Sequence, residues 1–161
     1  KDYIELFVEM DADFSHDPRE LKEKIDFFKK HELDMLIASR YTKNSKILNW
    51  SIFRRSFSLL SNFLAKLLLK IPCTDYTNGF RFYSRRAAET VVNKCRKNGD
   101  GFIVLSEILV EIHSNNYKID ELSTIFVNRE RGHSSVNLKL IVSSLFGLIK
   151  LYYLKKQKHK I

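Results

Sequence analysis

The chain of 161 residues carries a formal net charge of +9, with 44% hydrophobic and 29% charged residues. This length allows one domain with a hydrophobic core, and the scarcity of Gly and Pro excludes a fibrous or disordered class. The positive charge indicates an anionic partner, which leaves nucleic acid, a membrane surface and a phosphorylated substrate open. The two cysteines make no disulfide framework, so a reducing compartment is favoured.

The first 40 residues predict a strand, a helix and a second strand. The apolar run at 4–10 (IELFVEM) predicts the first strand, and DMLIAS at 34–39 predicts the second. Between them, Asp17 is expected to cap a helix over 18–31, with Pro18 at its first position. This order is typical of a parallel α/β unit.

The middle of the chain predicts further alternation of helices and strands. Apolar residues at helical spacing, from Trp50 to Leu68, indicate a long helix over about 47–69. The remaining central elements are a loop and strand at 72–84, a helix at 85–95 capped by Ser84, a helix at 102–114 and a strand at 118–127.

The last predicted helix, residues 138–154, contains two lysines and is shorter than the roughly 20 apolar residues that cross a membrane. Two interpretations remain open. It is an amphipathic helix at a membrane interface, with the lysine-rich tail meeting anionic head groups, or a terminal helix packed on the core.

Asp11 and Asp13 follow the first predicted strand directly. Residues two apart in an extended chain point to the same side, and the carboxyl edge of a parallel sheet is where α/β folds bind ligands. Two carboxylates there predict a site for Mg2+ or Mn2+, which in turn can hold a diphosphate. Taken alone, the pair also fits a capped polar turn.

Five motifs follow one another: MDADFSHDP, ASRY, W-x3-R-R-x2-S, DYTNGFRFY and FVNRERGHS. In this order they resemble the family 2 glycosyltransferases with a GT-A fold, above all the dolichyl-phosphate (polyprenyl-phosphate) mannosyltransferase branch. The resemblance implies an α/β fold: a partial GT-A (Rossmann-like) domain, with a mixed sheet flanked by helices. Residues 1–137 are then expected to be the second half of a catalytic domain, without its N-terminal nucleotide-binding βα units. Residues 138–161 are expected to form the amphipathic interface helix and basic tail.

The resemblance implies a donor side built from acidic and basic residues. Asp11 and Asp13 match the ligands of the metal and of the sugar-nucleotide diphosphate. Arg40, at the end of the second strand, can hold a phosphate by two parallel hydrogen bonds, or pair with a carboxylate. A basic loop over the diphosphate is implied at Arg129, Arg131, Gly132 and Ser134. Ser135 stands where the family usually has Lys, so Arg131 or a nearby lysine is expected to substitute.

The acceptor side is implied by Arg54 and Ser58, which are four residues apart and share a helix face. In the family this pair grips the phosphate of the lipid acceptor, and the alternative is a solvated helix face. Asp75 matches a catalytic-site Asp near the acceptor, with a loop cap as the alternative. Supporting positions are Gly79 for close backbone approach, Arg81 for a phosphate or for Asp75, and Glu107, which otherwise faces solvent.

The activity implied is transfer of a hexosyl group, with mannosyl favoured, from a nucleotide diphosphate sugar to polyprenyl (dolichyl) phosphate. The reaction would be metal-dependent and inverting, with GDP-mannose as the favoured donor, at the cytoplasmic face of a membrane to which the protein is peripheral or anchored. The 161 residues alone are expected to be inactive. A lipid phosphate is already an anion near pH 7, so no general base is required.

Two alternatives remain. One is another family 2 glycosyltransferase acting on a glycan or a different lipid. The other, from a different class, is a basic nucleic-acid-binding or catalytically inactive interaction domain. Nucleic-acid binding is disfavoured because the aromatic residues fall mostly on apolar stripes, so no nucleic-acid partner is expected.

Overall fold

The structure, a computed structural model, describes residues 4–95, 102–128 and 138–158. Within these ranges the strands are β1 (Leu6–Glu9), β2 (Met35–Ser39), β3 (Lys46–Leu48), β4 (Arg81–Ser84), β5 (Ile119–Ser123) and β6 (Ile125–Val127). The helices are a short 3-10 helix (Pro18–Glu20), α1 (Leu21–Lys30), α2 (Ile52–Leu69), α3 (Arg85–Lys94), α4 (Phe102–Ser114) and α5 (Leu138–Lys158). The predicted α/β class is confirmed.

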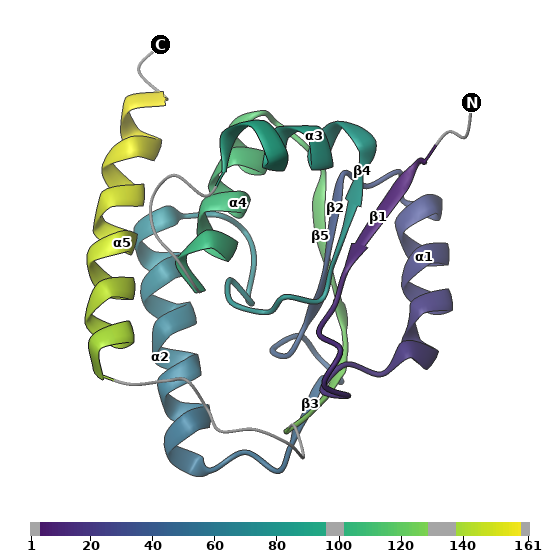
Figure 1. Cartoon of the computed structure of the whole chain (residues 1–161), viewed down its shortest axis with the longest axis horizontal. Helices are drawn as coiled ribbons and strands as arrows, with labels where there is room; N and C mark the ends of the chain where they lie inside the picture. The colour runs from purple at the N-terminus through teal and green to yellow at the C-terminus, as the bar shows by residue number, and fades with distance from the viewer. Residues whose placement is uncertain (1–3, 96–101, 129–137, 159–161) are drawn as a thin grey trace.

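The main sheet is mixed and has the strand order β1-β4-β2-β5. β4 is antiparallel to both β1 and β2, and β2 pairs in parallel with β5. The predicted strand–helix–strand unit therefore forms, but β4 lies between its two strands. In Figure 1, α1 covers one face of this sheet, and α3 and α4 lie on the other face, with α2 and α5 beyond them.

Each face of the sheet packs on its own hydrophobic cluster, because side chains alternate along a strand. Met35 and Ile37 of β2 join the cluster that also contains residues of α2 to α5. Leu36 and Ala38 point the other way and pack with Phe28 of α1. β2 is thus buried on both sides, as its continuous apolar run indicates.

The helix caps follow the sequence signals. The Asp17 side chain accepts the backbone N–H of Arg19, with Pro18 at the first helical position, and Ser84 accepts the N–H of Ala87 at the start of α3. The predicted start of the long helix at residue 47 is wrong. The Ser51 side chain accepts the N–H of Arg54, so α2 begins at Ile52.

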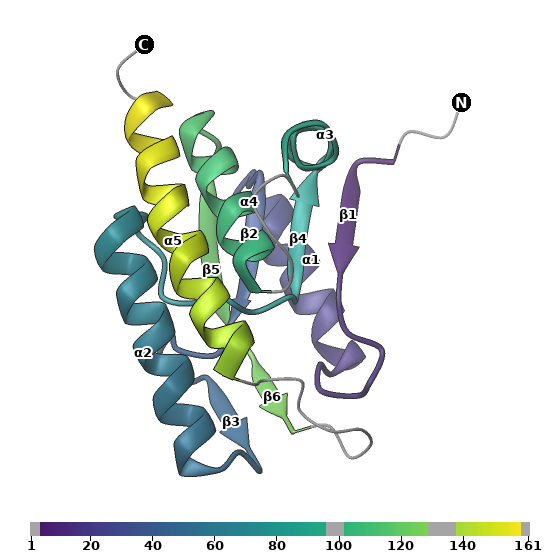
Figure 2. The ribbon, with the colours of Figure 1, turned by 60° about the vertical axis from the view of Figure 1, so that its left-hand side comes forward.

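Two short strands form a second sheet that the sequence analysis missed. β3 pairs in parallel with β6, below the main sheet in the view of Figure 2. The single strand predicted at 118–127 is therefore wrong, since it is broken at Thr124. The Thr124 backbone N–H donates to the carbonyl of Ser39, and its hydroxyl donates to Glu20, so the chain leaves one sheet there and enters the other.

One face of α5 packs on the core through Leu148 and Leu151, which supports the core-packing interpretation of this helix. The opposite face exposes large apolar side chains, with Phe146 at 70%, Tyr153 at 60% and Ile149 at 48%. In the described part of the chain, no helix has the length and apolar character needed to cross a membrane.

Replacing Gly147 by alanine is expected to lower the free energy of unfolding by about 1–3 kcal/mol, although Gly→Ala usually stabilises a helix. A Cβ at this position would lie 2.6 Å from Cγ1 and 2.9 Å from Cδ1 of Ile103, which is itself buried. α5 would have to shift away from α4. Urea unfolding measures the change, and an equal or higher stability of the variant would contradict this packing.

Candidate active site

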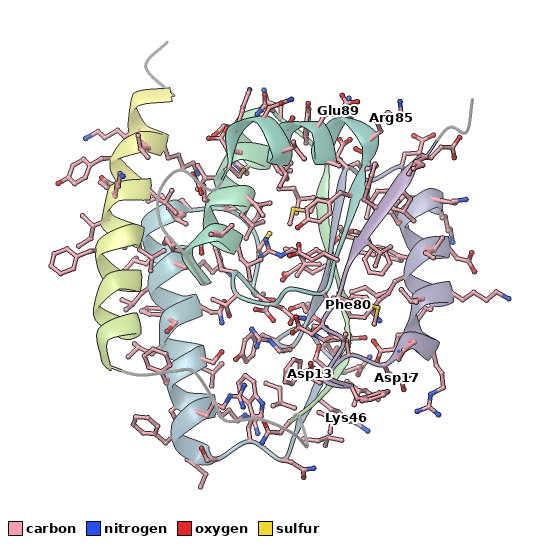
Figure 3. All side chains as sticks on the ribbon, in the orientation of Figure 1. Asp13, Asp17, Lys46, Phe80, Arg85 and Glu89 are labelled. Atoms are coloured by element: carbon pink, nitrogen blue, oxygen red, sulfur yellow. The ribbon has the colours of Figure 1, made fainter. Side chains whose placement is uncertain are left out.

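Three loops meet at one end of the main sheet. β1 ends at Glu9, and Arg81, the first residue of the antiparallel β4, pairs with both Glu9 and Ile37 of β2. The loops that follow β1 and β2 and the loop that precedes β4 therefore lie together. In Figure 3, Asp13, Lys46 and Phe80 are labelled at this end, whereas Arg85 and Glu89 lie at the opposite end.

The loop after β1 carries the two predicted metal ligands. Asp11 is exposed, and its Oδ1 would lie 3.9 Å from a Cβ added at Gly79, an ordinary contact at a backbone position without a positive φ. Oδ1 of Asp13 accepts the N–H of Ser15 at 3.0 Å. The Ser15 hydroxyl is buried and has no hydrogen-bond partner among the described residues. The loop thus offers carboxylate and hydroxyl oxygens, the hard ligands that Mg2+ prefers.

His16 ties this loop to the one before β4. Its Nδ1 accepts the backbone N–H of Asp11, and its Nε2 lies 3.1 Å from Oδ1 of Asn78. Burial lowers the pKa of His16, and the negative charge of Asp11 opposes this shift without cancelling it. The imidazole is therefore neutral near pH 7. No role for His16 was predicted from the sequence, although it stands inside the acidic motif.

Arg40 and Asp75 form a buried ion pair. Nε of Arg40 donates to Oδ2 of Asp75 at 2.8 Å, its second terminal nitrogen donates to Oδ1 at 2.7 Å, and its backbone N–H also donates to Oδ2. Burial by itself would raise the pKa of Asp75, but the charge and hydrogen bonds of Arg40 lower it below its ordinary value. The sequence predicts that Arg40 contacts the donor phosphate, whereas in the structure its Nε and one terminal nitrogen donate to Asp75.

Glu121 of β5 orders the loop that carries Asp75. Its carboxylate accepts the backbone N–H groups of Thr74 and Asp75, at 2.7 and 2.9 Å, and the Thr74 hydroxyl. No local sequence pattern predicts this contact, because it joins residues that are 46 and 47 positions apart.

One face of α2 contacts the loop after β2, the loop before β4 and the segment after β6. Tyr41 donates its hydroxyl to Ser58 at 2.6 Å, and Arg54 donates to Oδ1 of Asn128 at 2.7 Å. One turn further on, the amide nitrogen of Asn62 donates to the Thr77 hydroxyl at 3.3 Å, and Arg40 donates to the same hydroxyl. Arg54 and Ser58 thus share a face, are both half-buried and each make a hydrogen bond, so they do not stand on a fully solvated face. Their role as the acceptor pair stays a prediction.

Trp50 lies between the two arginines of the site. Cζ of Arg54 is 4.2 Å from the Trp50 ring centroid, and Cζ of Arg40 is 5.4 Å from it. Phe126 meets the same ring edge-on at 5.3 Å. Trp50 was predicted to belong to the apolar stripe of a helix, but it precedes α2 and supports both guanidinium groups by cation–π contact.

Arg81 and Glu107, two of the predicted supporting residues, are both buried. Arg81 is fully buried and donates to the carbonyls of Asn78, Tyr76 and Leu105, so these carbonyls take the place predicted for a phosphate or for Asp75. Glu107 is only 2% exposed, so the alternative that it faces solvent is wrong. The remaining predicted residues of the basic loop lie outside the described residues: Arg129, Arg131, Gly132, Ser134 and Ser135.

The described ranges contain no group of three or more His, Cys, Asp or Glu side chains placed to hold a metal ion. Asp11 and Asp13 stay predicted ligands, and the buried Ser15 hydroxyl of the same loop has no hydrogen-bond partner among the described residues. Mg2+ is commonly bound by one or two carboxylates together with substrate phosphates and water. The residues present fit an ion of this kind.

A mixed sheet flanked by helices is consistent with a partial GT-A glycosyltransferase domain. The model of a protein family described as glycosyl transferase family 2 matches residues 4–92. This match covers more than half of the chain, and the chain belongs to that family.

Two curated relatives are similar over most of the chain. A polyprenol monophosphomannose synthase from Mycolicibacterium smegmatis is 29% identical over 141 residues, which is 88% of this chain and 52% of the relative. An undecaprenyl-phosphate mannosyltransferase from Micrococcus luteus is 28% identical over 134 residues, which is 83% of this chain and 54% of the relative. The chain thus spans about half the length of these relatives.

Proposed function

We propose that this chain belongs to a metal-dependent, inverting glycosyltransferase that moves a mannosyl group from GDP-mannose to a polyprenyl phosphate. The observation that carries the proposal is that Arg54 and Ser58 share one face of α2, where Ser58 accepts the hydroxyl of Tyr41 and Arg54 donates to Asn128. One turn further on, Asn62 donates to Thr77 in the loop that carries Asp75. Family membership supports the reaction class, and the activities for which the two relatives are named support the lipid phosphate and the sugar.

On the donor side, Asp11, Asp13 and the Ser15 hydroxyl would hold Mg2+ or Mn2+. When bound, such an ion neutralises charge on the departing diphosphate. Arg129 and Arg131 are proposed as further contacts of the diphosphate. Arg40 acts from within the protein, because its pair with Asp75 fixes the loop between the donor and acceptor sides.

On the acceptor side, Arg54 and Ser58 would hold the lipid phosphate, with Trp50 and Asn128 orienting the Arg54 guanidinium. The phosphate oxygen is already an anion, so attack on the anomeric carbon requires alignment rather than removal of a proton. The new oxygen–carbon bond forms as the bond to the diphosphate breaks, which inverts that carbon. Asp75, kept ionised by Arg40, orders the loop beside this path.

A membrane contact is proposed along α2 and α5, which pack side by side (Figure 2). The outer face of α2 exposes large apolar side chains, including Ile52, Phe53, Phe63 and Leu67. α5 also exposes large apolar side chains, Phe146, Ile149 and Tyr153. Exposed apolar side chains on two neighbouring helices fit contact with a lipid surface, on the side of α2 that faces away from Arg54 and Ser58.

Arg54→Ala is expected to reduce transfer to polyprenyl phosphate by about 10–150-fold, the equivalent of a charged hydrogen bond worth about 1.5–3 kcal/mol. The loss should appear mainly as a higher KM for the lipid. Initial rates of label transfer from GDP-mannose in the full-length protein measure it. Arg55→Ala is the matched control, since the exposed Arg55 has the same charge one position along the helix and should change the rate little. Equal effects of the two variants would contradict the assignment of Arg54.

A further inference from the structure

His16 lies between the two loops that carry the candidate carboxylates. It is only 1% exposed, its ring stacks on Phe80 with a centroid distance of 5.0 Å, and it meets Phe126 edge-on at 5.3 Å. A side chain enclosed in this way does not reach a substrate. Any part that it takes in the reaction acts through its neighbours.

The hydrogen bonds of His16 fix which ring nitrogen carries the proton. The backbone N–H of Asp11 donates to Nδ1 at 3.1 Å, and because a backbone N–H can only donate, Nδ1 carries no proton. Nε2 then carries it and donates to Oδ1 of Asn78 at 3.1 Å. The Asn78 amide nitrogen donates to the carbonyl of Ala38, which agrees with this orientation of the amide.

The same chain of hydrogen bonds continues to the buried ion pair. The backbone N–H of Asn78 donates to Oδ1 of Asp75 at 3.1 Å, and Arg40 holds that carboxylate from the other side. His16, Asn78 and Asp75 are each at most 2% exposed. A buried network of hydrogen bonds, with a donor and an acceptor assigned at each step, therefore joins the backbone of Asp11 to the loop before β4.

We propose that His16, as its Nε2–H tautomer, is a positioning residue that holds Asp11 by its backbone at a fixed place relative to the Asp75 loop. The inference rests on the proposed function, in which Asp11 is a metal ligand. A partner that orients a metal ligand typically changes metal affinity or activity by about 10–100-fold when it is removed. A buried His that serves packing alone would have no such effect.

Three variants separate positioning from packing. His16→Asn can keep an acceptor at the δ position for the Asp11 N–H, but cannot reach Asn78. His16→Gln can keep a donor at the ε position for Asn78, but loses the bond to Asp11. His16→Phe keeps a ring against Phe80 and loses both bonds. The two amides are matched in polarity, so their difference reports the bond to Asp11.

The experiment measures Mn2+ affinity by electron paramagnetic resonance, with GDP present and the lipid absent, in the full-length protein. His16→Gln and His16→Phe are expected to bind Mn2+ about 10–100-fold more weakly than the unaltered protein, and His16→Asn to lie clearly closer to it. Thermal unfolding checks that each variant is folded. In the unaltered protein, the long-range 1H–15N NMR spectrum of the His16 ring is expected to show a protonated Nε2 and an unprotonated Nδ1.

The opposite tautomer would overturn the inference. So would equal Mn2+ affinities of the Asn and Gln variants, or Mn2+ affinities that follow the thermal stability alone. Failure of the proposed function gives a different result. If Mn2+ affinity depends on His16 as expected but no sugar is transferred to a polyprenyl phosphate, the positioning role of His16 is supported. The assignment of polyprenyl phosphate as the acceptor is then wrong.

Discussion

Asp75→Ala is expected to lower the free energy of unfolding by about 3–5 kcal/mol, because it leaves a buried guanidinium without its counter-charge. The side chains of Arg40 and Asp75 are 6% and 0% exposed, and Asp75 also accepts the backbone N–H groups of Thr77 and Asn78. The change removes the organising group of the loop as well as a charge. Urea unfolding at neutral pH measures it.

A surface ion pair provides the matched control for this result. The Arg19 side chain is 90% exposed and pairs with Asp17 at 2.7 Å, so Arg19→Ala should leave the stability almost unchanged. If Asp75→Ala cost no more than this control, the buried pair would not organise the site.

Asp13→Asn is expected to reduce kcat/KM for mannosyl transfer by at least about 100-fold, because one negative charge that would hold the metal ion is lost. The amide keeps an oxygen that can accept the N–H of Ser15, so the loop should keep its fold. Initial rates at increasing Mn2+ concentration measure the effect, and the variant should require more metal.

The same substitution at Asp17 is the control for Asp13→Asn. Asp17 stands in the same segment but caps the 3-10 helix before α1, and asparagine caps helices equally well. Asp17→Asn should therefore keep nearly full activity with an unchanged metal requirement. An active Asp13→Asn variant with normal Mn2+ dependence would remove Asp13 from the metal site.

The local elements could be predicted because their signals lie within a few residues. Asp17 with Pro18, and Ser84 before α3, mark their helix starts directly. The three-residue strands β3 and β6 carry too short a pattern to be recognised. The position of β4 between β1 and β2 is set by pairing between segments more than 40 residues apart, which periodicity does not encode.

The sequence predicts which residues make up the candidate site, and these assignments stay predictions, but it does not predict the contacts among them. Asp11, Asp13, Arg54 and Ser58 stand on the loop and helix face where the sequence places them. The sequence does not reveal that Arg40 and Asp75 neutralise each other, because both are charges near the same sheet edge and their pairing depends on burial. His16 was missed for a similar reason, since its partner Asn78 is 62 residues away.

The most direct test of the proposed function is transfer of labelled sugar to polyprenyl phosphate by the full-length protein. Membranes containing it would be incubated with labelled GDP-mannose, UDP-glucose or UDP-N-acetylglucosamine, with and without Mn2+, and label in the organic phase would be counted. The proposed function predicts lipid label from GDP-mannose only when the metal is present. A folded protein that gives no lipid label from any of these donors would contradict it.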